Sequence, residues 1–180
     1  LLKINLYDEG EPFLNKEIYK IIKYLHNNNV ASCVSSNFSL KFSDEDFKKM
    51  IDSKLDHLIV AVDGVNQESY SSYRKGGDFN LVISNIKRLT YFINLYKSSL
   101  KVEFQYLEFE DSNKEHLNQA KELAKSLDVW KFTAIKDCSR EGWDGYLFKG
   151  CEEERRKCGC YQIWFSGSIL SNGDYHSCDF

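Results

Sequence analysis

Cysteine is the residue type in this sequence with the most evident potential for chemistry, because its six copies are unevenly spaced. Four of them fall within the last thirty of the 180 residues: Cys151, Cys158, Cys160 and Cys178. Clustered thiolates are soft ligands that suit zinc or an iron–sulfur cluster, and in a reducing compartment such a cluster favours a metal over disulfide bonds. We therefore expect a metal site in this cysteine-rich segment.

A hairpin signal lies inside the same segment. The dipeptide Asn172-Gly173 stands between the apolar pair Ile169-Leu170 and Tyr175, and Asn-Gly flanked by apolar residues favours a two-residue β-hairpin turn. Glycines become frequent after about residue 137, where the regular alternation of strand and helix patterns stops. We interpret 138–180 as a small module appended to a larger domain at 1–137.

Polar residues that follow expected strands form a second group with chemical potential: Glu9-Gly10-Glu11-Pro12, Ser35-Ser36-Asn37, Asp63-Gly64 and Glu108-Phe109-Glu110. Parallel α/β domains bind ligands at the carboxyl ends of their strands. The Glu11 carboxylate can accept hydrogen bonds from an ammonium group, and Gly10 lets a ligand approach the backbone closely. The alternatives are a strand-to-loop turn with an N-cap at 9–12 and an ordinary turn at Asp63-Gly64.

The elements that must position these groups follow from the hydrophobic period. Strands are expected at 2–7, 30–35, 58–62, 102–109 and 129–135, and helices at 17–27, 44–51, 79–89 and 117–127. Ser43 can cap the second helix, with Asp46 at its third position. The continuous apolar run at 58–62 is typical of a strand covered on both faces.

Strict alternation of strands and helices requires crossover helices and a parallel sheet, so the expected fold class is α/β. The sheet is either an open doubly wound sheet or part of a (β/α) barrel. Five strands are too few to close an eight-stranded barrel, and no strand precedes the one expected at Leu2, as though the chain begins within a larger architecture.

The amino-acid composition limits which classes of molecule we expect this chain to bind. The chain carries 24 basic and 27 acidic side chains, a net charge of −3, and 42% hydrophobic residues. This composition is typical of one globular domain, or one and a fraction. The interspersed charges form no basic face, so we expect neither a nucleic-acid partner nor a membrane partner. No apolar run reaches the roughly 18 to 20 residues of a membrane span, and no signal-peptide layout is present, so the default location is the cytoplasm.

One succession of motifs resembles the core of radical SAM enzymes in order and spacing. It comprises Leu6 to Asn15 with Gly10-Glu11-Pro12, Ser35-Ser36-Asn37, Val62-Asp63-Gly64, Tyr73 to Gly77, and Asn85 to Leu89. The resemblance implies a partial (β/α) TIM-like barrel at 1–137 and S-adenosylmethionine as cofactor. In such enzymes the Gly-Glu-Pro stretch holds the methionine ammonium and later strand ends hold the rest of the cofactor. The chain departs from the usual pattern at Glu9, where a glycine is common, and at Ala61, where a polar side chain is common.

By this resemblance, Gly10 and Glu11 are the leading cofactor contacts, and Ser36, Asn37 and Asp63 are further ones. Arg74 would face the cofactor carboxylate, and an exposed surface arginine is the alternative reading of that residue.

The spacing C-x12-G-x4-C, from Cys160 through Gly173 to Cys178, resembles the opening of the SPASM extension found behind many radical SAM barrels. That resemblance implies that the two thiolates ligate an auxiliary [4Fe-4S] cluster and that the hairpin at Asn172-Gly173 brings them together. Cys158 could replace Cys160 or belong to another site. Zinc is the competing metal for such a cluster.

The other thiols and the histidines have simpler interpretations. We interpret Cys138 and Cys151 as free thiols and Cys33 as a small core residue. The four histidines show no metal-ligand spacing with one another and are interpreted as surface or hydrogen-bonded residues: His26, His57, His116 and His176.

Radical SAM chemistry depends on a C-x3-C-x2-C loop, and no such triplet occurs in this sequence. The resemblance therefore implies an internal fragment whose cluster loop lies upstream of Leu1 and which should not catalyse a reaction alone. The full enzyme would reduce S-adenosylmethionine with an electron donor such as a flavodoxin or ferredoxin. The resulting 5′-deoxyadenosyl radical would abstract hydrogen from a peptide or small-molecule substrate. The alternative is a non-catalytic α/β interaction module with a zinc-binding cysteine tail.

Overall fold

The computed structural model describes residues 2–7, 10–108, 114–136, 168–169 and 174–176. The chain divides into two units, Leu1–Asp137 and Cys138–Phe180.

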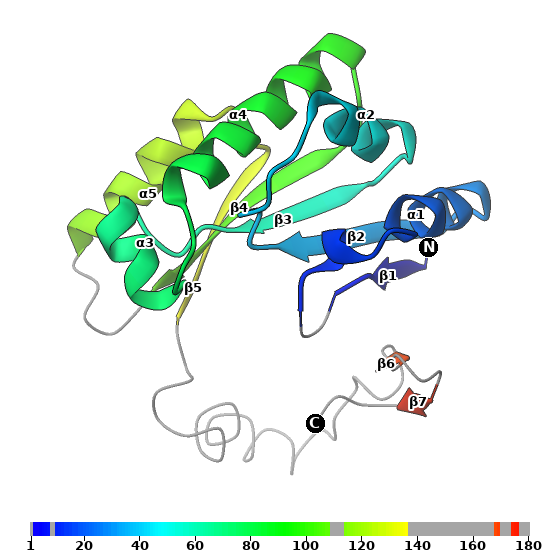
Figure 1. The fold of residues 1–180 in the computed structure, drawn as a ribbon, viewed down its shortest axis with the longest axis horizontal. Helices are drawn as coiled ribbons and strands as arrows, with labels where there is room; N and C mark the ends of the chain where they lie inside the picture. Colours follow the sequence, from blue (N-terminus) through cyan, green and yellow to red (C-terminus); the bar gives the residue numbers. More distant parts are fainter. Residues whose placement is uncertain (1, 8–9, 109–113, 137–167, 170–173, 177–180) are drawn as a thin grey trace, which may run out of the picture. The chain divides into compact units, whose positions relative to one another are not determined.

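A parallel sheet of five strands forms the centre of the first unit (Figure 1). Its strands lie side by side in chain order: β1 Lys3–Asn5, β2 Ala31–Ser36, β3 His57–Ala61, β4 Lys101–Glu108 and β5 Lys131–Lys136. A doubly wound sheet would reverse its strand order partway across. The sequential order confirms the α/β class and selects the partial (β/α) barrel, which the five strands leave open.

The connections between strands are helical: η1 Pro12–Leu14, α1 Ile18–Asn27, α2 Asp44–Asp52, α3 Gln67–Tyr73, α4 Phe79–Tyr96 and α5 Lys114–Ser126. Right-handed crossovers between sequential neighbours place the helices on one face of the sheet. Figure 1 shows α2 and α4 together on the same side of β3 and β4.

The hydrophobic core lies between this sheet and its helices. Leu58 and Val60 of β3 are fully buried in it, whereas His57 and Ile59, which alternate with them, are only half-buried. Side chains along a strand point alternately to the two faces. Within the run at 58–62, which was expected to be covered on both faces, Ile59 alone is half-buried; the other four residues are buried, including Ala61 on the same face as Ile59.

Local sequence explains the start of α2. Ser43 caps the helix, its hydroxyl accepts from the Asp46 backbone N–H at 3.3 Å, and the Asp46 carboxylate accepts from the Ser43 backbone N–H at 2.9 Å. This reciprocal capping box confirms the predicted cap. The hydrogen bonds from Ser43 lower the pKa of Asp46 from its usual 3.8.

The capping box gives a pH-dependent prediction. Because the pKa of Asp46 is lower in the folded chain, its contribution to stability is present above about pH 4 and is lost as pH falls through the lowered pKa. We expect Asp46→Asn to reduce the free energy of unfolding by about 1 kcal/mol at pH 7 and by less at pH 3, where the unfolded chain already binds the proton. Urea unfolding at both pH values measures this difference. Glu45→Gln on the same helix turn is the control, since Glu45 is exposed, and a loss that persists unchanged at pH 3 would contradict the prediction.

Helix α3 was not predicted from the sequence. Tyr70 is its one buried residue, so the segment has no apolar stripe to reveal a helical period. The sequence feature that could have revealed this helix is its N-cap residue, Asn66, whose side chain accepts from the Ser69 backbone N–H at 2.9 Å. Gly64 permits the close approach of this helix, because a Cβ atom at Gly64 would lie 2.5 Å from the Tyr70 backbone.

In the second unit, β6 Ser168–Ile169 and β7 Tyr175–His176 pair antiparallel, with Ile169 opposite Tyr175. The antiparallel pairing confirms that these two strands form a hairpin; the predicted turn at Asn172-Gly173 lies outside the described residues. Within the described part of the chain, none of the helices is both long enough and apolar enough to span a membrane.

Candidate functional site at the carboxyl ends of the strands

The segment after β1 holds the first predicted contacts, Gly10 and Glu11. Gly10 has φ +103°, a conformation that favours glycine. A Cβ atom at Gly10 would meet no described atom within 4 Å, so the backbone conformation, more than lack of space, requires glycine here. Glu11 caps η1, with Pro12 in the first turn, and its Oε1 accepts from the Phe13 N–H at 3.3 Å.

Glu11 also joins this segment to the end of β2. Its Oε2 accepts from the Ser36 hydroxyl at 2.9 Å and from the Asn37 backbone N–H at 3.1 Å. The structure therefore brings together four of the residues predicted to bind the cofactor: Gly10, Glu11, Ser36 and Asn37. Three donors hold a carboxylate whose remaining lone pairs can accept from a ligand donor such as an ammonium group.

The loop after β2 is itself held in place by α4. Phe38 has φ 56°, which is uncommon for a bulky residue, and its N–H donates to the Ser36 hydroxyl at 2.8 Å. The buried Asn85 amide donates to the Phe38 carbonyl at 2.9 Å and to the Leu40 carbonyl at 2.8 Å. Asn85 therefore fixes a strained loop on which Ser36 reaches Glu11.

We expect Asn85→Ala to lower the free energy of unfolding by about 2 to 3 kcal/mol, because two carbonyls lose their donor and a buried amide leaves a gap. Urea unfolding followed by circular dichroism measures the loss. Asn80→Ala on the exposed face of the same helix is the matched control, and equal losses in the two variants would contradict the role assigned to Asn85.

At the end of β3, Asp63 and Arg74 form an ion pair. Asp63 is 3% exposed, its Oδ2 lies 2.7 Å from Arg74 Nε and 2.6 Å from Nη2, and its Oδ1 accepts from the Leu107 N–H on β4 at 3.2 Å. The Arg74 side chain keeps 34% of its surface exposed. A buried carboxylate therefore orients the Arg74 guanidinium. This arrangement differs from both expected readings, an exposed surface arginine and an arginine that contacts only a ligand.

The face of the sheet away from the helices contains polar groups that no sequence motif marks. Cys33 is fully buried, as expected, but its Sγ lies 3.4 Å from Nδ1 of His57. His57 is the hydrogen-bonded residue that the second of its two expected readings describes. It is mostly buried, its Nδ1 contacts Cys33, and its Nε2 lies 3.0 Å from the Glu103 carboxylate. Register between strands produces these contacts, and no local motif could reveal them.

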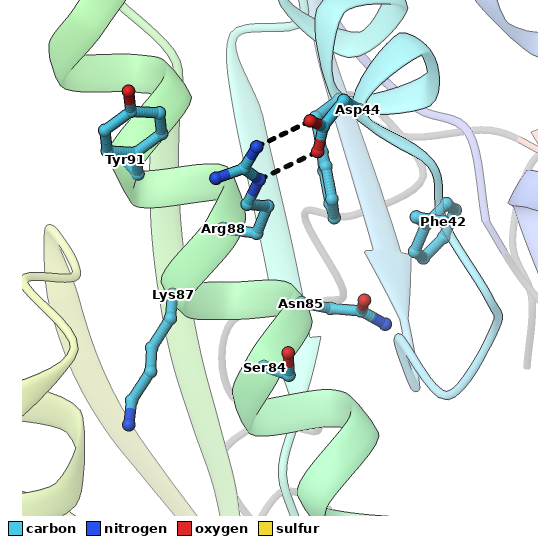
Figure 2. Close-up of a pocket in the computed structure, with 8 residues that line it drawn as sticks. Phe42, Asp44, Ser84, Asn85, Lys87, Arg88 and Tyr91 are labelled. Carbon is cyan, nitrogen blue, oxygen red and sulfur yellow. Dashed lines mark hydrogen bonds and ion pairs between the residues drawn. The ribbon is translucent and has the colours of Figure 1, made fainter.

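A separate cavity of about 460 Å³ opens between α2 and α4 (Figure 2). Figure 2 shows Arg88 directed at Asp44, to which it donates two hydrogen bonds, and Arg88 also lies over the Tyr91 ring. Asn85 borders this cavity, but its amide is engaged by the carbonyls of the loop after β2. None of the residues predicted to bind a cofactor lines the cavity, and Arg88 and Asn85 on its wall are already paired.

The predicted metal ligands Cys160, Cys178 and Cys158 lie outside the described residues. Among the residues that the structure does describe, no group of three or more histidine, cysteine, aspartate or glutamate side chains could hold a metal ion.

Comparison with known proteins relates the fold to solved structures. No protein-family model and no curated protein matches the sequence. The chain is similar to SuiB from Streptococcus suis, with 12% identity over 98% of this chain and 49% of that protein, and a TM-score of 0.68. It is also similar to TYW1 with a lysine-pyruvate adduct bound, with 18% identity over 76% of this chain and 43% of that one, and a TM-score of 0.57.

An archaeal TYW1 is similar as well, with 20% identity over 71% of this chain and 40% of that one, and a TM-score of 0.52. The chain thus spans less than half the length of each of these proteins. At these identities the likeness concerns the fold alone, and the chain has the α/β fold of a partial TIM barrel.

Proposed function

We propose that this chain is the part of a radical SAM enzyme that binds S-adenosylmethionine. The observation that carries the proposal is the hydrogen-bonded cluster of Glu11, Ser36 and Asn37 at the carboxyl ends of β1 and β2, in a chain that shares the fold of radical SAM enzymes. A ligand at these strand ends lies where parallel α/β folds bind theirs.

The described residues fit a zwitterionic amino-acid group. The Glu11 carboxylate, fixed by three donors, can accept from the methionine ammonium, and the Gly10 backbone leaves that approach open. Arg74, oriented by Asp63, offers guanidinium N–H groups to a carboxylate. We assign Ser36, Asn37 and Asp63 to shaping and fixing these two groups.

S-adenosylmethionine bound with its cluster would supply radical chemistry for hydrogen abstraction from a substrate. The residues of this chain bind and orient the cofactor and shield it from water, because the cofactor carries the reaction itself. The full protein would receive its electron from a donor such as a flavodoxin or ferredoxin and act on a peptide or small molecule. We further propose that Cys160 and Cys178, or Cys158 in place of Cys160, ligate an auxiliary [4Fe-4S] cluster in a SPASM-type extension.

The test uses the full-length protein, purified anaerobically and reconstituted with iron and sulfide. We expect calorimetry to show binding of S-adenosylmethionine, and the dithionite-reduced protein to release 5′-deoxyadenosine. Iron and acid-labile sulfide beyond one cluster, lost in a Cys160→Ser/Cys178→Ser variant, would support the auxiliary cluster. Stoichiometric zinc without sulfide, together with no binding of S-adenosylmethionine, would overturn the proposal in favour of an interaction module.

A further inference from the structure

Two side chains hold the Arg74 guanidinium, and only one of them is the carboxylate of Asp63. Asp63 Oδ2 lies 2.7 Å from Arg74 Nε and 2.6 Å from Nη2. Arg74 Cζ also lies over the ring of Tyr73, the last residue of α3, at 5.1 Å from the ring centroid. A cation within about 6 Å of an aromatic centroid is attracted by the electrons of the ring face. Tyr73 therefore contributes to the orientation of Arg74.

The two contacts engage different parts of the guanidinium. Asp63 engages the edge formed by Nε and Nη2, whereas the Tyr73 ring meets a flat face and uses none of the N–H groups. Arginine has five N–H donors in one plane, so the edge formed by Nη1 and Nη2 can serve a further acceptor. The two parallel N–H groups of such an edge match the two oxygens of a carboxylate. The 34% exposure of the Arg74 side chain gives a ligand access to it.

The carboxylate of Asp63 does not fix the plane of the guanidinium by itself. Both Arg74 nitrogens bond the same oxygen, Oδ2, while Oδ1 accepts from the Leu107 N–H at 3.2 Å. Two bonds to one oxygen let the guanidinium plane turn about the line that joins Cζ to that oxygen, whereas bonds to two oxygens would fix the plane. The Tyr73 ring opposes this turn, because turning would lift the flat face of the guanidinium off the ring.

The backbone around Arg74 is held as well. Its N–H donates to the Tyr70 carbonyl at 2.8 Å, and its carbonyl accepts from the Gly77 N–H at 2.9 Å. Gly77 packs closely on the buried Tyr70 ring, since a Cβ atom at Gly77 would lie 2.6 Å from that ring. The turn of the guanidinium plane is thus a main freedom that remains to Arg74, and removing it in advance lowers the entropic cost of binding a ligand.

We infer that Tyr73 is a positioning residue for the cofactor: its ring holds the Arg74 guanidinium in the plane in which the Nη1–Nη2 edge meets the carboxylate of S-adenosylmethionine. This inference rests on the proposed function, which assigns that carboxylate to Arg74. The ring face acts here and the hydroxyl does not, so another aromatic side chain at position 73 would serve equally.

The test compares two ligands on the full-length protein, purified anaerobically and reconstituted with iron and sulfide. One is S-adenosylmethionine, and the other is decarboxylated S-adenosylmethionine, the same sulfonium nucleoside without the carboxylate. Isothermal titration calorimetry measures the dissociation constant of each ligand. We expect Tyr73→Leu to weaken the binding of S-adenosylmethionine by about twofold to fivefold, as the loss of one exposed cation–π contact predicts. Binding of the decarboxylated ligand should not change.

Two variants control for other effects of the substitution. Tyr73→Phe keeps the ring and should retain the affinity of the unchanged protein for S-adenosylmethionine. Tyr24→Leu removes an exposed tyrosine from α1 and should leave the affinity for both ligands unchanged. Equal losses for the two ligands in Tyr73→Leu, equal losses in Tyr73→Leu and Tyr73→Phe, or no loss in Tyr73→Leu would each overturn the inference.

The comparison of ligands also separates positioning from folding. A partly unfolded variant loses affinity for both ligands by the same factor, and Tyr73 is exposed, so its replacement removes little core packing. Tyr73→Met replaces Tyr73→Leu if that variant fails to fold, and Tyr73→Phe decides the question if the decarboxylated ligand binds too weakly to measure. Binding of S-adenosylmethionine that is insensitive to loss of the ring refutes this inference alone, whereas no binding to the unchanged protein refutes the proposed function.

Discussion

Replacing Glu11 by glutamine is expected to weaken the binding of S-adenosylmethionine by about tenfold to a hundredfold. The carboxylate accepts from Phe13, Ser36 and Asn37. An amide that keeps its oxygen toward Ser36 and Asn37 turns its NH₂ group toward the Phe13 N–H and the incoming ammonium, so donors face donors. Hydrogen bonds to charged groups contribute roughly 1.5 to 3 kcal/mol, and about 1.4 kcal/mol changes affinity tenfold.

Isothermal titration calorimetry of the full-length protein measures this loss. Glu17→Gln is the matched control, because Glu17 lies on the exposed start of α1 and forms its ion pair with the surface residue Lys20. The role of Glu11 would be refuted by an unchanged affinity in Glu11→Gln, or by an equal loss in the control.

Asp63→Asn is expected to lower the free energy of unfolding by about 2 to 4 kcal/mol, a larger loss than for Asp46→Asn. Removing one partner of a buried ion pair generally costs about 3 to 5 kcal/mol, and the 34% exposure of the Arg74 side chain lets water offset part of that. The substitution also replaces the acceptor of the Leu107 N–H, which links β3 to β4.

Urea unfolding followed by circular dichroism provides the measurement, with exposed Asp52→Asn as the control. Arg74→Met combined with Asp63→Asn should cost less than the sum of the single changes, because each single change leaves the other partner unpaired. Strict additivity would show that the two side chains do not stabilise the fold as a pair.

Local sequence was sufficient to predict most elements of the first unit. The apolar stripes of α1 and α4 and the Ser43 cap of α2 are set by neighbouring residues, and alternation of patterns indicated the parallel sheet. Helix α3 was missed because its single buried residue gives no period.

Physical reasoning from the sequence alone could not predict the contacts among the candidate cofactor-binding residues. Glu11 and Ser36 are 25 positions apart, and they meet because Asn5 on β1 is in register with Cys33 on β2. The resemblance to a family identified these residues as candidates, whereas the sequence pattern could not predict the hydrogen bonds between them. The contacts among Cys33, His57 and Glu103 could not be predicted for the same reason, since each of these residues comes from a different strand.

Asn85 connects the edge of the sheet where we propose that the cofactor binds to the outer layer of helices. Its helix packs against α2 beside the Arg88–Asp44 pair, while its amide holds the loop that follows Ser36. Loosening that outer packing would let the loop relax from its left-handed bend at Phe38 and release the restraint on Glu11. Distant surface changes on α4 should therefore alter ligand affinity and thermal resistance in parallel, so that the melting temperatures of α4 variants rank their cofactor dissociation constants.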